Sequence, residues 1–258
     1  MTVLVDVLPV VPLPVVRVVV SVPGGRSWSL VGVTDEGVWP VASGVSSGAE
    51  VVTADPWAPV GVDVSYELRH GGVVESAGPI VRPFDGAGGL FTDLSGRHVA
   101  EFQWQHGDPR EGERRAHFSA VPGSRFSPSR LDPVAGAGGG GVEAQTTGVH
   151  TVALRGLLDS NRPLVLLHNR YRCQVPGCDV QASQTVYVTS DPNDRSPRTD
   201  AAHRVWDLSY RLMPSGVVGG AVPVVTLGDV KSKFATLADV KAAVPKLSDL
   251  ARGDWLFA

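Results

Sequence analysis

Residues 60–81, VGVDVSYELRHGGVVESAGPIV, contain the clearest strand signal in the chain. Apolar and β-branched residues recur through residues 60–68 and 73–81, and Gly71 and Gly72 lie between the two runs. A glycine pair in this position is typical of a tight hairpin, because glycine adopts the positive φ angles that such turns require. The stretch therefore predicts two antiparallel strands joined at Gly71 and Gly72.

Similar short runs continue towards the N-terminus, separated by proline- and glycine-containing turns. They lie at residues 16–22, 27–34, 38–41 and 49–53. About six or seven short strands, with turns about every eight to twelve residues, are typical of a β-sandwich. A sandwich is therefore predicted over residues 16–83, after an extended N-terminal arm or edge strand at residues 1–15, which carry three prolines.

A second strand-rich region follows a glycine-rich boundary at residues 82–89. Its predicted strands lie at residues 99–106, 116–121, 142–147, 164–168, 185–190 and 204–212. One helix is predicted at residues 149–160, where Val152, Leu154, Leu157 and Leu158 recur at helical spacing. Residues 84–213 are therefore predicted to form a β-barrel-like domain or sandwich with one packed helix, which makes the whole chain mainly β.

The C-terminal residues repeat one phrase at a spacing of ten: TLGDVK at 226–231, TLADVK at 236–241 and KLSDLA at 246–251. At about 100° per residue, successive phrases would rotate by about 80° along one helix, so a single long helix does not fit. Thr226 and Thr236 stand where N-caps belong, and an aspartate three residues later can complete each capping box. Residues 214–258 are therefore predicted to be a linker followed by an arm of short helices.

Each short helix of this arm carries a narrow apolar stripe that needs a covering surface, because such short helices are unstable alone in water. All lysines of the chain lie in the arm, whereas the preceding residues use arginine, which indicates a separate module with a solvated face. The arm either folds back on its own body or reaches over a neighbouring subunit. The candidate interface residues are Leu227, Val230, Phe234, Leu237, Val240, Val244, Leu247, Leu250 and Trp255.

The charge balance gives no sign of a nucleic-acid or membrane partner. The chain has 23 basic and 26 acidic residues, for a formal net charge of −3. No uninterrupted apolar run reaches the roughly eighteen residues of a membrane span, and the N-terminus lacks the basic segment of a signal peptide. We expect a soluble protein made in the cytosol.

No motif indicates an enzyme or a cofactor. The seven histidines lack the spacing of a Ser-His-Asp triad or a His-Glu-x-x-His metal site. Residues 136–141 are glycine-rich but lack the lysine of a phosphate loop, and we expect a flexible connection there. Acidic and arginine residues alternate at 108–115, as is usual at a solvated hairpin tip, and a polyanion-binding patch is the weaker interpretation.

His168, Cys173, Cys178 and His203 are residue types that bind zinc, but the two cysteines are five positions apart. Zinc sites usually place them about two to four residues apart. Val175, Pro176 and Gly177 indicate a hairpin turn, across which the thiols are predicted to face each other as a free pair or a disulfide. A structural metal is the less favoured alternative, and no metal site is predicted.

Short motifs are spread along nearly the whole chain: DPWAPVG at 55–61, VSY at 64–66, FSAVPGSR at 118–125, the helix at 151–160 with PLVLL at 163–167, VYV at 186–188, RVW at 204–206, and the repeated arm with GDW at 253–255. Together they resemble minor tail proteins of siphophages that infect actinobacteria, in the distal-tail or baseplate-hub adaptor class. The resemblance departs at Ser124, which interrupts the family's Pro-Gly-Arg turn. Residues 58–68 with the following hairpin also resemble the later strands of fibronectin type III-like modules.

The resemblance implies a structural virion component that is not an enzyme, assembled in the host cytoplasm and resident in the phage tail. Such proteins form an oligomeric ring or hub, here of three or six copies, which joins the tail tube to the tip proteins. A closed ring needs contacts between subunits, which favours an arm that reaches over its neighbour. The alternative is a carbohydrate- or cell-wall-binding module with Trp39, Trp57 or Trp104 as sugar platforms, although tryptophan is commonly a core residue of β-sandwiches.

Overall fold

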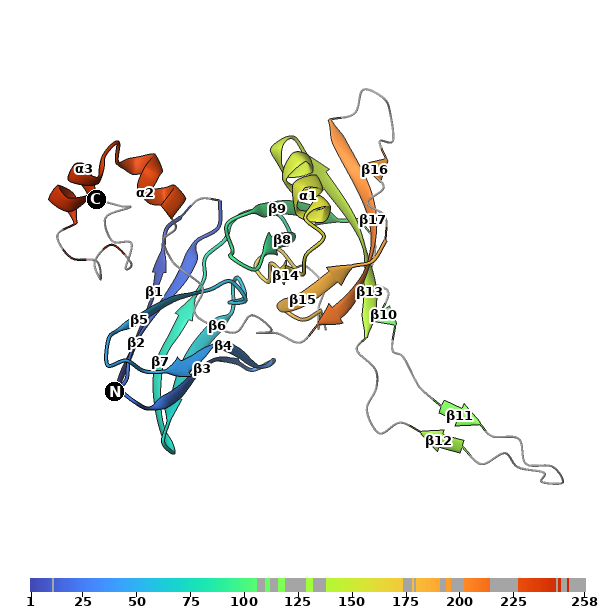
Figure 1. The fold of residues 1–258 in the computed structure, drawn as a ribbon. Helices are drawn as coiled ribbons and strands as arrows, with labels where there is room; N and C mark the ends of the chain where they lie inside the picture. The colour runs from blue at the N-terminus through green and yellow to red at the C-terminus, as the bar shows by residue number, and fades with distance from the viewer. Residues whose placement is uncertain are drawn as a thin grey trace.

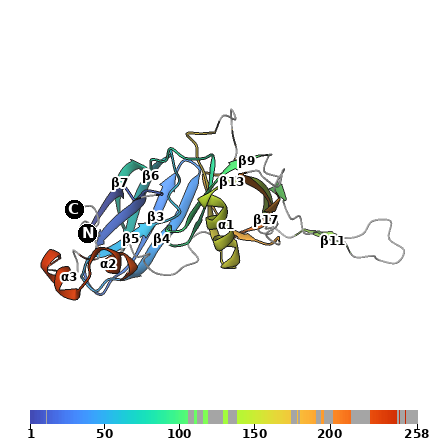
Figure 2. The same ribbon diagram turned by 90° about the horizontal axis from the view of Figure 1, so that it is seen from above.

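The computed structural model confirms a mainly β chain with one helix packed on a β domain. A β-sandwich and a β-barrel lie side by side, and short helices of a C-terminal arm lie outside both (Figure 1 and Figure 2). The structure describes residues 1–10, 12–105, 110–111, 116–118, 129–131, 138–173, 178, 180–190, 194–195, 202–213, 227–244, 246 and 250.

Two antiparallel sheets form the N-terminal sandwich. Three strands in the order β1-β2-β5 face four strands in the order β4-β3-β6-β7, which is the arrangement expected of a fibronectin type III-like module. Alternate side chains of β2 and β6 are buried between the sheets, as a half-buried strand requires. The bounds are β1 (Thr2–Leu8), β2 (Val15–Ser21), β3 (Ser27–Thr34), β4 (Gly37–Val45), β5 (Val51–Asp55), β6 (Asp63–His70) and β7 (Val73–Val81).

The hairpin that joins β6 to β7 forms where the sequence predicts it. Gly71 and Gly72 have φ angles of 54° and 81°, and His70 pairs with Val73 directly across the turn. Residues 1–15 were expected to form either an extended arm or an edge strand, and the structure shows an edge strand. Their strand β1 pairs with β2 from Thr2 to Leu8 and lies at the edge of its sheet, so these residues belong to the sandwich.

Six antiparallel strands close into the barrel, because β13 pairs with β9 on one side and with β17 on the other. They are β8 (Gly89–Asp93), β9 (Val99–Trp104), β13 (Gly139–Thr147), β14 (Leu164–His168), β15 (Ser183–Val188) and β17 (His203–Met213). Two short strands extend this sheet, β10 (Arg110–Glu111) on β13 and β16 (Asp194–Arg195) on β17. Strands β11 (Ala116–Phe118) and β12 (Ser129–Leu131) pair with each other away from the barrel (Figure 1).

Helix α1 (Val149–Asp159) packs against the barrel strands β8, β9 and β13. Leu154 and Leu157 are buried in the barrel core, but Val152, expected on the same face, is 74% exposed. At about 100° per residue, Val152 lies about 200° from Leu154 and therefore faces away from the barrel. No helix in the described ranges has both the length and the apolar character needed to cross a membrane.

Three features differ from the sequence predictions for the barrel. The strand expected from residue 116 is β11, which pairs with β12 in a separate sheet and not with the barrel. Strand β8 was not predicted, because four of its five residues are buried and it lacks the alternation of a half-buried strand. Residues 139–141, expected within a flexible connection, pair with β17 as the start of β13. A Cβ atom at Gly139 would lie 2.7 Å from the Tyr210 carbonyl oxygen, so glycine lets the two backbones approach closely at this point.

Candidate functional site

The C-terminal arm contains the residues that the sequence nominates for a subunit interface. Its described helices are α2 (Leu227–Lys233) and α3 (Leu237–Ala243). Helix α3 begins with the predicted capping box: the Asp239 amide donates to Thr236 Oγ1 at 3.3 Å, and the Thr236 amide donates to Asp239 Oδ2 at 2.9 Å. Thr226, the predicted cap of α2, lies outside the described residues.

The apolar residues of the arm differ widely in burial. Leu227 and Leu237 are each 86% exposed, whereas Val244 is buried. Val230, Phe234, Val240 and Leu250 are half-buried, and Leu247 and Trp255 lie outside the described residues. Neither hydrophobic core found in the described ranges contains an arm residue, and Figure 1 shows α2 and α3 outside the sandwich and the barrel.

A buried polar cluster lies inside the sandwich and was not predicted. The Asp55 carboxylate accepts hydrogen bonds from Trp39 Nε1 at 3.0 Å and from the Tyr66 hydroxyl at 2.9 Å. Arg82 donates to the backbone carbonyl oxygens of Pro14 and Ala58 at 2.6 and 2.9 Å. Burial raises the pKa of Asp55 and lowers the pKa of Arg82 to about 10. Because Asp55 and Arg82 are each only 1% exposed, the cluster serves the fold and not a substrate.

A cleft of about 1000 Å³ lies between α1 and the turn that joins β8 to β9. Asp93 in this turn accepts from Ser95 Oγ at 2.5 Å and lies 3.1 Å from His98 Nδ1, so a serine, an aspartate and a histidine meet here. Both side chains contact the aspartate, however, whereas a hydrolase needs its serine bonded to the histidine. The three residues therefore stabilise a turn and do not form a catalytic triad.

The tryptophans considered as sugar platforms are largely inside the protein. Trp39 is 9% and Trp57 2% exposed, and their indole nitrogens donate to Asp55 and Thr185, respectively. Trp104 is half-buried, and its ring packs edgewise on Phe102. Buried rings cannot stack on a sugar, so Trp39 and Trp57 are core residues, which contradicts the platform hypothesis for them.

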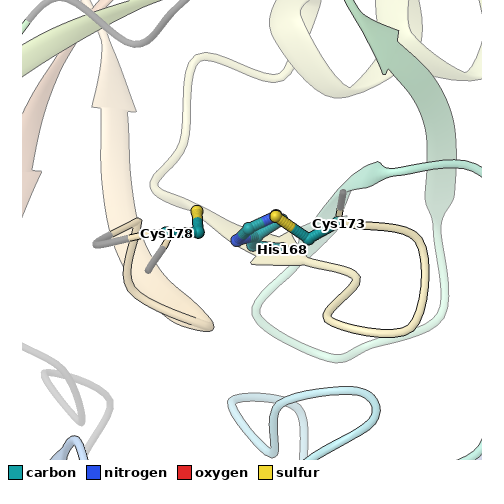
Figure 3. Close-up of side chains that lie close together, drawn as sticks. All are labelled: His168, Cys173 and Cys178. Atoms are coloured by element: carbon teal, nitrogen blue, oxygen red, sulfur yellow. The ribbon is translucent and has the colours of Figure 1, made fainter. Parts of the chain in front are cut away.

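The structure brings His168 together with both cysteines, which the sequence did not predict (Figure 3). A ring nitrogen of His168 and the sulfurs of Cys173 and Cys178 all lie within 4.8 Å of one another. The two thiols are free, and His203 does not belong to this group. The predicted turn between the cysteines, Val175 to Gly177, lies outside the described residues.

The chain matches no protein-family model and no curated protein.

Proposed function

We propose that the protein is a structural component of a phage tail tip or baseplate, forming a ring or hub of three or six copies that joins the tail tube to the tip proteins. The observation that carries this proposal is the exposure of Leu227 and Leu237 on helices outside both hydrophobic cores. Helices of seven residues are unstable alone in water, so α2 and α3 need a surface to cover their apolar side chains. In a ring, that surface belongs to the next copy.

Exposed apolar side chains on two contacting strands of the sandwich support an acceptor surface for a neighbour's arm. Strands β1 and β7 contact each other there, and the Val3 amide donates to Glu75 Oε1 at 3.3 Å. Leu4, Val73 and Val74 are exposed on these two strands, more than half of each side chain. Contact between arm and sandwich is heterologous, and repeated heterologous contacts generate closed rings when the rotation closes.

Tail assembly in the phage that encodes the chain tests this function. Removal of residues 225–258 is expected to leave both β domains folded, because neither core includes any of the arm residues that the structure describes. Tails should nevertheless fail to assemble, as seen by electron microscopy of the lysate. Normal tails from this truncated protein would contradict the proposal.

A double substitution gives a sharper version of the same test. Leu227→Asp with Leu237→Asp places two charges on the proposed contact and should also abolish tails. The matched control is Val149→Asp with Val152→Asp, which adds the same two charges to exposed positions of α1. The control should assemble normally; its failure would show that added charge alone disrupts the tail.

A carbohydrate-binding module is the weaker candidate. Two of its proposed aromatic platforms, Trp39 and Trp57, are buried, and each donates a hydrogen bond within the protein. A glycan array probed with the purified chain is expected to show no binding. Specific binding would support the carbohydrate-binding function instead.

A further inference from the structure

Three potential metal ligands converge where the end of β14 meets the loop before β15. His168 is the last residue of β14, and Cys173 and Cys178 follow in the loop. Figure 3 shows the histidine ring between the two cysteine side chains. Zinc–ligand bonds of about 2.1 Å to nitrogen and 2.3 Å to sulfur place tetrahedral ligand atoms about 3.5–3.8 Å apart. Because the three atoms lie within 4.8 Å of one another, contraction by at most about 1.3 Å completes this geometry.

The histidine has the burial and the hydrogen bonding of a metal ligand. His168 is 5% exposed, yet its Nδ1 atom has no hydrogen-bond partner among the described residues. Buried ring nitrogens are normally partnered, so this atom indicates a missing one. The ring also forms a hydrogen bond with the Val180 backbone, and such a bond at the other ring nitrogen is typical of a metal-bound histidine.

We propose that His168, Cys173 and Cys178 bind one zinc ion. Two thiolates and one imidazole form a soft donor set that suits Zn²⁺, whereas Mg²⁺ and Ca²⁺ prefer oxygen ligands. Both thiols release their protons to solvent when the ion binds. With three ligands from these side chains, water completes a tetrahedral coordination.

The loop that the ion would hold connects the two domains. Arg170 forms an ion pair with Glu36 in the turn between β3 and β4, and the Ala182 amide donates to the same carboxylate at 2.8 Å. Tyr171 lies against Gly61, where an added Cβ would approach its ring to 2.8 Å. Zinc is therefore placed to fix this loop in the conformation that bridges barrel and sandwich. This role of the zinc ion lies within one chain and does not depend on oligomer formation.

A disulfide between Cys173 and Cys178 is the competing state, because it would consume the same two sulfurs. The zinc-bound and disulfide states differ in the number and reactivity of their free thiols. A zinc-bound protein has thiols that react slowly until a chelator removes the ion, whereas an oxidised protein has none.

The test is metal analysis of the full chain, purified in reducing buffer and washed free of loosely bound ions. We expect about one equivalent of zinc per chain, as a site of this kind binds one ion. Substitution of the ion by Co²⁺ should give the intense visible bands of tetrahedral cobalt and thiolate charge transfer in the near ultraviolet. Zinc should also raise the unfolding temperature of the stripped protein.

Cys173→Ser and Cys178→Ser are the principal variants, because both positions are half-buried and the exchange hardly changes the side-chain volume. Each should lower the zinc affinity at least about tenfold and weaken the thiolate charge-transfer band to roughly half, because one of the two thiolates remains. His98→Gln, at an exposed histidine outside the cluster, is the control and should bind zinc as the native chain does. Absence of stoichiometric zinc from reduced native protein, or unchanged binding in both serine variants, would overturn the proposal.

Discussion

Trp57 Nε1 donates a 3.0 Å hydrogen bond to Thr185 Oγ1, which joins the sandwich to the barrel across 128 residues of sequence. Both side chains are buried. Around them, barrel residues Leu90, Val165 and Leu167 pack into the same hydrophobic core as the sandwich strands. The two β domains therefore share a core, and we expect them to unfold together.

Thr185→Val tests this connection, because it keeps the side-chain shape and removes the acceptor. The buried indole N–H loses its partner, which should lower the free energy of unfolding by about 1–3 kcal/mol. Chemical denaturation followed by tryptophan fluorescence and by far-ultraviolet circular dichroism should give one coincident transition. Two separate transitions in the native chain would show that the domains are independent.

Arg82 should be far more important for stability than a surface arginine. Arg82→Met removes the donor of the buried Pro14 and Ala58 carbonyl oxygens and the positive charge that acts on Asp55, a change expected to cost about 3 kcal/mol or more in the free energy of unfolding. Arg69→Met is the matched control, because Arg69 forms an exposed ion pair with Glu67 and should lose about 1 kcal/mol at most. Equal losses in the two variants would contradict the assigned role of the buried cluster.

Asp93 should make stability depend on pH. Burial raises its pKa, but hydrogen bonds from Ser95, His98 and the backbone amides of His98 and Arg97 outweigh burial and leave the pKa below its usual value. A carboxyl whose pKa is lower in the folded state stabilises the protein above its unfolded pKa of about 3.9 and loses that contribution as the pH falls through the folded pKa.

Asp93→Asn removes this titration. At pH 7 the variant should be less stable than the native chain by about 1–2 kcal/mol, and the gap should narrow as the pH falls below about 4. Urea denaturation at a series of pH values measures both effects. A gap that stays constant down to acidic pH would refute the role given to the Asp93 carboxylate.

Loss of the N-cap of α3 is expected to destabilise this helix of the arm but not the two β domains. Thr236→Ala removes the side-chain oxygen that accepts from the Asp239 amide and should destabilise the helix by about 1 kcal/mol. Hydrogen exchange should become faster at residues 237–243, while the unfolding temperature of the β domains stays unchanged. Thr236→Ser retains an oxygen at this position and serves as the control; exchange as fast as in the alanine variant would argue against capping.

Features with local causes could be predicted from the sequence. Strands β3, β7 and β14 have the predicted bounds, since alternation, a glycine hairpin or a compact apolar run identifies each one. The capping box of α3 needs only Thr236 and Asp239, three residues apart. The chain order of these elements was sufficient to predict a sandwich followed by a barrel with one packed helix.

Features that depend on distant neighbours could not be predicted. Glycines at 139–141 form a strand because β17 approaches them closely, and nothing in the local sequence indicates that partner. The meeting of His168 with Cys173 and Cys178 likewise depends on tertiary structure that their spacing in the sequence does not indicate. Asp55 and Arg82 are charged residues whose burial follows from the packing of two sheets and a domain junction.

The mass of the intact protein in solution tests the central claim most directly. Native mass spectrometry or light scattering of the purified full chain should give three or six copies, and the Leu227→Asp/Leu237→Asp variant should give a folded monomer. A native chain that is monomeric at high concentration, or a double variant with the native mass, would contradict the account of this protein as an assembly subunit.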